Sequence, residues 1–359
     1  MNKRFTATTR ALAHSQLLIP LLAFFLLIVF NLIRDPSFFS VALVKNNLGN
    51  MVLSGNLISI IDNASELALL AIGMTLVTAA SKGQDISVGA AATIAGSVFI
   101  NVLRANDMSL PMILFAFLAS CVVAMLFGAF NGTLVALFKI QPMIATLILY
   151  TAGRDIAYWI NGGASPDLTD KTLTNYFGTF FPGIPIPTPI LLVCVCLIIM
   201  ALILKFTNLG LYAQAVGINE NAARLNGIDP VRIKLLVFII LGICVALAGS
   251  VNVCRMGSLN HKTALLDIEM DAILAVAIGG NALIGGKFSM VGSVMGAYII
   301  RALQTTLYAM EVSSDAIKAY KAVVIIAIVL IGSPVVKKYA SLLFSKLRKN
   351  TAVVQTGDL

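Results

Sequence analysis

About ten long apolar runs occupy most of this sequence and constrain its fold more than any other feature. A helix needs about 20 mainly apolar residues to cross a hydrocarbon core about 30 Å thick. Only 11% of the 359 residues are charged, whereas soluble domains carry about 25%. The sequence therefore predicts an all-α polytopic membrane protein. Its predicted transmembrane spans are residues 17–33, 57–79, 88–103, 110–137, 142–160, 189–204, 233–253, 270–286, 289–310 and 316–335.

The distribution of positive charge predicts the orientation of these spans, because Lys and Arg concentrate in cytoplasmic segments. When both chain ends are placed in the cytoplasm, the inner segments hold 15 of the 25 Lys and Arg residues and the outer segments hold eight. Arg154 and Arg301 lie within spans. We therefore expect a cytoplasmic tail at 1–16, a transmembrane domain at 17–335 and a second cytoplasmic tail at 336–359.

Several classes of function lack support in the sequence. A net charge of +9 would suggest nucleic acid for a soluble protein, but here it is better explained by topology and by contact with anionic lipid. The five cysteines lie in or beside apolar runs, which favours packing over disulfides or metal ligands. The glycine-rich stretch 279–287 lacks residues that a phosphate-binding loop requires, and its double glycines favour a helix break at a membrane surface. We predict no catalytic, cofactor or metal site and no nucleic-acid partner.

The polar stretch 208–230 lies in the longest predicted inner loop. Asn219 is a good helix N-cap, with Glu220 in the first turn, where the helix dipole favours negative charge. Gly227 follows as the residue that ends the helix, and Asp229-Pro230 begins the next one. The stretch therefore predicts one short, rigid docking helix of about two turns. The residues expected to couple it to a partner are Gly217, Asn219, Glu220, Ala222, Ala223, Arg224 and Gly227.

Charged residues within the spans are candidates for a transport path or gate. Arg154, the neighbouring Asp155 and Arg301 lie well inside their spans, where charges usually face a bundle interior or water. The structural alternative is that Arg154 pairs with a backbone carbonyl or an acid, and that Arg301 extends outward to the membrane surface. In the predicted inner turn 81–89, Asp85 or Ser87 either caps the next helix or belongs to a cytoplasmic gate.

The source of energy for any transport must be external, because no nucleotide motif occurs in the chain. An ATPase subunit that grips the docking helix would supply it. The alternative is a self-contained secondary carrier or facilitator, which would usually show more ionisable residues or broken helices near the midplane. A membrane scaffold is a third class. The outer loops 161–188 and 254–269 are long enough to receive a soluble partner.

Four separate motifs resemble the ribose-type sugar permeases of bacterial ABC importers, a group within the branched-chain amino acid and ribose permease superfamily. The resemblance covers about residues 55 to 335. It includes the coupling segment around Gly217 and Asn219, the stretch 139–147 with Arg154 following, and Ala71-Ile72-Gly73-Met74-Thr75. The fourth motif is Glu269-Met270-Asp271-Ala272-Ile273 with the glycine pairs that follow it, which makes Asp271 a further candidate gate residue.

The resemblance implies a permease subunit in the bacterial inner membrane. It implies a separate ABC ATPase, an extracytoplasmic sugar-binding protein and a second permease subunit, identical or paralogous, as partners. The substrate would be a monosaccharide such as ribose, galactose or galactofuranose. Two departures affect the substrate or gate. Lys82 and Gln84 replace small or apolar residues of the family pattern, and Asp155 replaces a small residue.

Overall fold

The computed structural model describes residues 18–45, 51–106, 108–170 and 172–332. The chain divides into two compact units, residues 1–306 and 307–359, which are described separately. The predicted tails at 1–16 and 336–359 lie outside the described residues. Within the second unit, the described chain comprises the end of helix α14 and helix α15.

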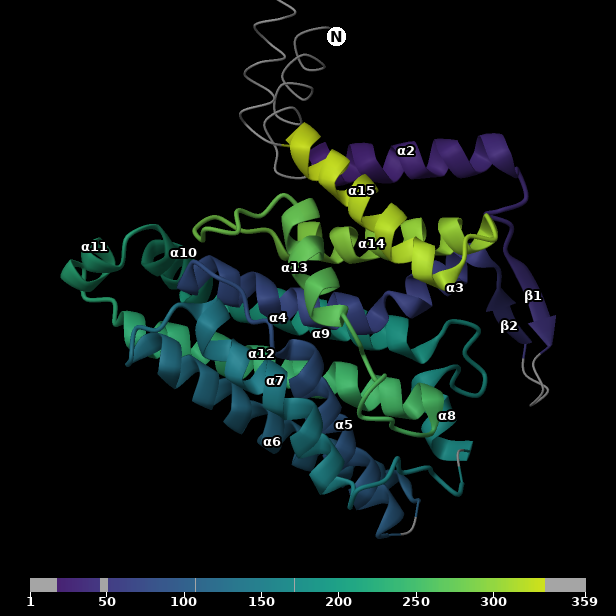
Figure 1. Ribbon diagram of the computed structural model, residues 1–359, viewed down its shortest axis with the longest axis horizontal. Coiled ribbons are helices and arrows are strands. Elements are labelled where there is room, and N and C mark those ends of the chain that lie inside the picture. The colour runs from purple at the N-terminus through teal and green to yellow at the C-terminus, as the bar shows by residue number, and fades with distance from the viewer. Residues whose placement is uncertain (1–17, 46–50, 107, 171, 333–359) are drawn as a thin grey trace, which may run out of the picture. The chain divides into compact units, whose positions relative to one another are not determined.

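Every predicted apolar run contains a helix in its described residues (Figure 1). The helices are α2 (Leu18–Arg34), α3 (Asn56–Asn63), α4 (Ser65–Ser81), α5 (Val88–Arg104), α6 (Leu110–Ala136), α7 (Pro142–Ile160), α8 (Thr172–Gly178), α9 (Thr188–Phe206), α10 (Leu209–Ile218), α11 (Glu220–Leu225), α12 (Pro230–Met256), α13 (Ile268–Ile278), α14 (Met290–Ala309) and α15 (Ser314–Gly332). An antiparallel hairpin of β1 (Ala42–Lys45) and β2 (Met51–Ser54) is an exception to the all-α prediction.

Among the described residues, α6, α9 and α12 are long and apolar enough to cross a membrane, and α3 with α4 forms a fourth candidate bent by 41°. The predicted span 270–286 is wrong as one continuous helix, because α13 ends at Ile278. Gly280, with φ 84°, then turns the chain, as the double glycines predicted. At 11 residues α13 is about 16 Å long, too short to cross a bilayer alone.

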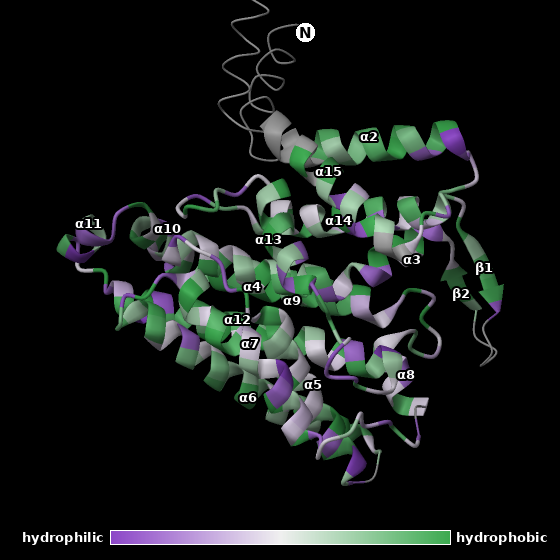
Figure 2. Ribbon diagram, viewed as in Figure 1, coloured by the Kyte–Doolittle hydropathy of each residue, from purple (hydrophilic) through white to green (hydrophobic). Residues whose placement is uncertain are grey.

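Helix α4 is the most enclosed element, since every residue from Ser65 to Ser81 is buried. Helix α12 packs against α4, α5 and α6 through small residues that let backbones approach closely. A Cβ on Gly242 would lie 2.6 Å from the carbonyl oxygen of Ala124, and one on Gly128 would overlap the carbonyl oxygen of Phe238. By contrast, α6 keeps Leu114, among other apolar side chains, exposed, and hydrophobic residues run along its length (Figure 2).

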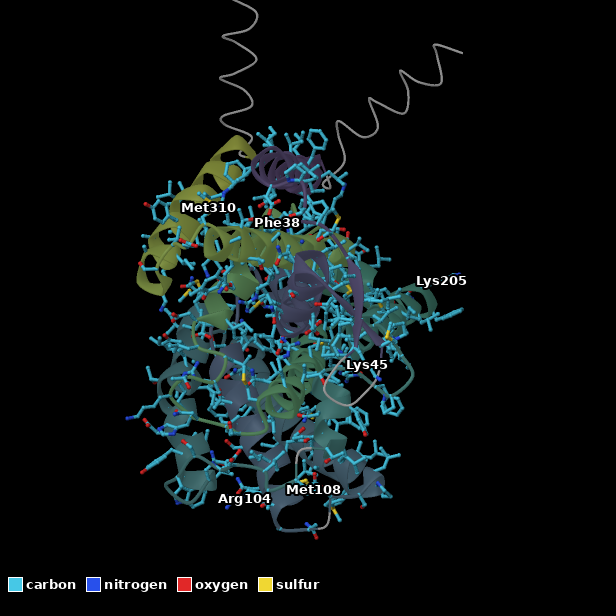
Figure 3. All side chains as sticks on the ribbon, turned by 90° about the vertical axis from the view of Figure 1, so that its right-hand side faces the viewer. Phe38, Lys45, Arg104, Met108, Lys205 and Met310 are labelled. Carbon is cyan, nitrogen blue, oxygen red and sulfur yellow. The ribbon has the colours of Figure 1, made fainter. Side chains whose placement is uncertain are left out.

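The two ends of the first unit differ in character. Helices α10 and α11 lie at one end in Figure 1, while α8 and the β1–β2 hairpin lie at the other. Hydrophilic residues gather around α11 (Figure 2). At the end of α9, Lys205 projects from the body (Figure 3), with its ammonium 5.8 Å from the ring centre of Phe206. The end that carries α10 and α11 therefore offers polar, projecting structure.

Candidate functional site: the coupling segment and the buried polar loop

The coupling segment, residues 208–230, contains two helices where the sequence predicted one. Helix α10 ends at Ile218 and α11 begins at Glu220, separated by Asn219 in an extended conformation. The Oδ1 atom of Asn219 accepts a hydrogen bond from the amide of Ala222 (3.1 Å), which confirms the predicted N-cap. Helix α10 was not predicted, because the prediction placed a single helix after the Asn219 cap.

The end of α11 follows the sequence prediction closely. Gly227 adopts φ 79° and its amide donates to the carbonyl of Arg224 (3.0 Å), while the amide of Ile228 donates to the carbonyl of Ala223 (3.1 Å). These two bonds form a Schellman motif, which satisfies carbonyls at a helix end. Asp229 then accepts from the first amides of α12, with Pro230 at its first position. The segment is thus held rigid by its own residues.

The surface of α11 is divided between exposed and buried residues. Leu225 is 89% exposed at its tip, and the side chains of Asn221, Ala222 and Arg224 are also exposed. Glu220 turns toward α12, where its Oε2 lies 2.6 Å from Nζ of Lys234. That hydrogen bond lowers the pKa of Glu220. Leu225 is thus an exposed apolar side chain among polar neighbours.

Gly217 and Ala223 are buried, so they shape the segment from within. A Cβ on Gly217 would overlap the carbonyl oxygen of Ala79 at the end of α4 and would lie 2.8 Å from the amide nitrogen of Gly286. Direct contact of these two residues with a partner would require the segment to open. Their predicted coupling role stays a prediction, and it would have to be exerted through packing.

The loop between α4 and α5 is buried and polar. The amide and hydroxyl of Ser87 both donate to Oδ1 of Asp85, at 2.7 and 2.6 Å. Nδ2 of Asn131, in α6, donates to Oδ2 of Asp85 (3.2 Å) and to Oγ of Ser87 (3.0 Å). The amide of Ile86 donates to Oγ1 of Thr146 in α7 (3.1 Å). The loop is therefore bonded to two further helices, α6 and α7.

The predicted side-chain cap of α5 is wrong in its detail. Ser87 occupies the N-cap position, but no side-chain cap bond forms there. The carboxylate of Asp85 instead accepts from Ser87 itself. The physical reason is burial: Asp85 is 3% exposed, and its oxygens take the nearest buried donors, which lie in the loop and in α6.

Arg154 lies on α7 and binds backbone carbonyls. Its guanidinium donates to the carbonyl oxygens of His261 (3.1 Å), Ala264 (2.8 Å) and Leu265 (3.3 Å). Those residues belong to the irregular segment that leads into α13. Irregular backbone is tolerated within a membrane only where protein or water satisfies its polar groups. Arg154 meets that need, which is the structural alternative set out from the sequence, and its role in a transport path stays a prediction.

The other candidate gate residues lie on different helices and in different surroundings. Asp155 is exposed on α7, next to Arg154 in sequence but on another face. Arg301, on α14, donates through Nη1 to Oε1 of Gln304 (2.7 Å), and its Nε is buried without a hydrogen-bond partner. Asp271 is 5% exposed in the first turn of α13.

Sequence reasoning missed Asn131 and Thr146, which hold the Asp85 loop, and Glu269, which is buried against Gly89. Oε2 of Glu269 has no hydrogen-bond partner in the structure. Asn131 carried a usable signal, since it is a polar residue inside the apolar run 110–137. Thr146 carried none, because threonine often bonds its own helix in a membrane span.

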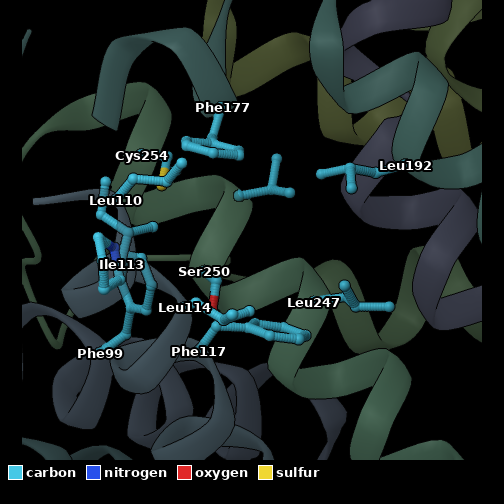
Figure 4. Close-up of a pocket in the computed structure, with 12 residues that line it drawn as sticks. Phe99, Leu110, Ile113, Leu114, Phe117, Phe177, Leu192, Leu247, Ser250 and Cys254 are labelled. Carbon is cyan, nitrogen blue, oxygen red and sulfur yellow. The ribbon is translucent and has the colours of Figure 1, made fainter. Parts of the chain in front are cut away.

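A pocket of about 580 Å³ lies between α5, α6, α8, α9 and α12 (Figure 4). Its lining is apolar apart from Ser250 and Cys254; it includes Phe99, Leu110, Phe117 and other hydrophobic side chains. A polyhydroxylated ligand needs hydrogen-bonding groups that this lining lacks. Among the described residues, no group of three or more His, Cys, Asp or Glu side chains could hold a metal ion.

Comparison with known proteins places the chain in context. The family described as the permease component of the branched-chain amino acid transport system matches residues 56–332. The chain is 37% identical over 318 residues to a galactofuranose transporter permease protein of Escherichia coli K12, covering 87% of this chain and 88% of that protein. No solved structure matches.

Two other relatives are similar along most of their length. A fructose import permease protein of Bifidobacterium longum is 34% identical over 329 residues, covering 90% of each chain. A ribose import permease protein of Escherichia coli K12 is 34% identical over 295 residues, covering 82% of this chain and 90% of that protein. With its family match and these relatives, the chain belongs to the family of permease components typified by the branched-chain amino acid transport system.

Proposed function

We propose that this chain is the membrane-spanning subunit of an ATP-driven ABC importer that carries a monosaccharide into the cell. The names of the relatives, which specify galactofuranose, fructose and ribose, support a sugar as substrate. The coupling segment is the observation that supports an ATP-driven mechanism, because its helix α11 is rigidly capped and presents Leu225, 89% exposed, at its tip. ATP hydrolysis is assigned to a separate ATPase subunit that docks on α11.

Ten crossings with both ends in the cytoplasm give the topology that best fits the charge distribution. The domain runs from 17 to 335, with cytoplasmic tails at 1–16 and 336–359, in a bacterial inner membrane. In this arrangement the eighth crossing combines α13 with irregular chain on either side. Broken helices of this kind occur in transporters where protein or a water-filled cavity satisfies the backbone. The bonds from Arg154 to the 261–265 segment fit that requirement.

The exposed face of α7 supports a sugar path at a contact between two permease subunits. Helix α7 follows α6 after a short connection and packs against α5 and α6, so it returns across the same membrane. Asp155 lies about 20 Å along it and is exposed. A carboxylate facing hydrocarbon would cost at least about 2.5 kcal/mol. We therefore place Asp155 toward water between this chain and a second permease subunit, where it accepts hydrogen bonds from sugar hydroxyls.

Transport proceeds by alternating access. A binding protein delivers the sugar to the outer loop 161–188 and to the outer end of the 254–269 segment. ATP binding draws the two ATPase subunits together and moves α10 and α11, and the bundle opens toward the binding protein. Hydrolysis reverses the movement and releases the sugar inward. The residues that we assign to holding or lining this path are Arg154, Arg301, Asp85, Ser87 and Asp271.

The test is uptake into proteoliposomes that contain the permease and its ATPase, with the binding protein outside. Radiolabelled ribose, galactose and fructose serve as probes. We expect uptake of one of them only when ATP is enclosed and the binding protein is present. Equal uptake without ATP would overturn the proposal in favour of a self-contained carrier.

A further inference from the structure

Three segments meet behind the coupling segment in a junction made of backbone. Gly217 and Ile218 end α10, Ala79 lies near the end of α4, and Gly286 belongs to the 279–289 loop. The amide of Gly286 donates to the carbonyl of Ala79 (3.0 Å). There is no space for a side chain at Gly217, whose Cβ would overlap that same carbonyl oxygen. Movement of α10 is therefore opposed directly by backbone atoms of the other two segments.

Two side chains of the α4–α5 loop fasten this junction. Nζ of Lys82 donates to the carbonyl oxygen of Ile218 (3.3 Å). Its positive charge also interacts favourably with the negative end of the α10 dipole. Nε2 of Gln84 donates to the carbonyl oxygen of Leu283 (2.8 Å). We call Lys82, Gln84 and the carbonyls of Ile218 and Leu283 the inner clasp. It connects one short loop to both α10 and the 279–289 loop.

The inner clasp is continuous in sequence with the buried polar network. Gln84 precedes Asp85, whose carboxylate binds Ser87 and Asn131, and Ile86 binds Thr146. A displacement of Ile218 therefore acts, through five consecutive residues of the loop, on α6 and α7. Asp155 lies on the exposed face of α7. The clasp thus links the coupling segment to the candidate path.

We propose that Lys82 and Gln84 are positioning residues that transmit movement of α10 and α11 to the α4–α5 loop and to the 279–289 loop. This inference rests on the proposed ATP-driven function. The two residues act through the carbonyls of Ile218 and Leu283. Coupling between distant sites in proteins is typically about 5- to 150-fold, and the clasp supplies a share of that range.

Two cysteine reporters separate transmission from docking. Asn221→Cys lies on the exposed face of α11 without altering Leu225, and Ile284→Cys lies on the 279–289 loop, where the native side chain is 79% exposed. Cys194→Ala removes the exposed native thiol, since the other four cysteines are buried. The labelling rate with a charged methanethiosulfonate is measured on the complex of permease and ATPase, with and without ATP and vanadate.

With the clasp intact, we expect the ATPase to protect Asn221→Cys and nucleotide to change the labelling rate of Ile284→Cys by about fivefold or more. In the double variant Lys82→Gly/Gln84→Met, the change at Ile284→Cys should fall below about twofold while Asn221→Cys stays protected. Glycine suits position 82, where φ is 56°, and methionine keeps the volume at position 84. Lys82→Arg should restore part of the response, because arginine also donates hydrogen bonds.

Lys205→Met is the matched control, since it removes an inner lysine that projects from the body (Figure 3). It should leave both labelling patterns unchanged. A full nucleotide response at Ile284→Cys in the double variant, or none in the intact protein, would overturn the clasp while leaving docking intact. Absence of protection at Asn221→Cys with the clasp intact would instead overturn the proposed docking and the clasp together.

Discussion

The coupling segment and the α4–α5 loop are both short polar stretches between apolar helices, yet different forces hold them. The α11 part of the coupling segment, residues 219–230, is largely exposed and is held mainly by bonds between near neighbours, such as Asn219 to Ala222, three residues apart. The α4–α5 loop is buried except at Lys82 and is held by distant partners, with Asn131 at a separation of 46 residues from Asp85 and Thr146 at 60 from Ile86. Local hydrogen bonds suit a segment that must move as a unit, whereas bonds to distant helices suit a loop that must respond to movement of the helix bundle.

Among side chains that bind distant parts of the chain, Arg154 should show the largest loss of stability when it is replaced, as in Arg154→Met. It removes a charged donor from three carbonyls of irregular backbone, which would cost about 1.5–3 kcal/mol and lower the melting temperature of the detergent-solubilised protein. Arg154→Lys should recover only part of the loss, because lysine lacks the planar fork of donors. An unchanged melting temperature in Arg154→Met would contradict the structural assignment.

Asn131→Leu tests the network around Asp85. The substitution leaves Oδ2 of Asp85 and Oγ of Ser87 without their α6 donor, at a cost of about 1–3 kcal/mol. Thermal unfolding of the purified chain measures it. Asn106→Leu is the control, because Asn106 is exposed and bonds only its own helix turn. Equal shifts in the two variants would show that the buried network adds nothing.

Asn219→Ala tests the local hydrogen bonds of the coupling segment. It should lower the stability of α11 by about 1 kcal/mol, while Asn219→Gly should lower it by only a few tenths. The loss should be confined to α11. Hydrogen exchange of the amides of Ala222 and Ala223 measures it directly, with faster exchange expected there and unchanged exchange in α4. Faster exchange throughout α4 would mean that the coupling segment is not an independent local unit.

The smallest effect is the pH dependence of the bond between Glu220 and Lys234. Because the folded pKa of Glu220 is lowered, its stabilisation is present above the unfolded pKa and is lost as the pH falls through the folded pKa. Glu220→Gln should therefore cost up to about 1 kcal/mol at pH 7 and almost nothing at the acid end of that window. Melting curves of wild type and Glu220→Gln across this range would converge on acidification. Curves that stay parallel would exclude this ion pair as the cause.

Features set by neighbouring residues could be predicted from the sequence, whereas contacts between distant residues could not. The helices follow from apolar runs, and the caps at Asn219, Gly227 and Asp229 follow from residues a few positions apart. Burial of Gly217 against Ala79 could not be predicted, because the two residues are distant in sequence and both lie in ordinary small-residue contexts. The early end of α13 was foreseeable from its double glycines, but the apolar residues 282–284 beyond them suggested that the span continued.

Docking of an ATPase on the tip of α11 can be tested by co-purification. The tagged permease and its ATPase are co-purified, and the ratio of the two subunits is compared between wild type and Leu225→Asp. Phe206→Ser serves as control, since Phe206 is also largely exposed, at 77%, but lies at the end of α9. We expect a roughly tenfold or greater loss of bound ATPase in Leu225→Asp, as for a buried apolar anchor, and none in Phe206→Ser. Equal ATPase recovery in all three proteins would contradict docking at this tip.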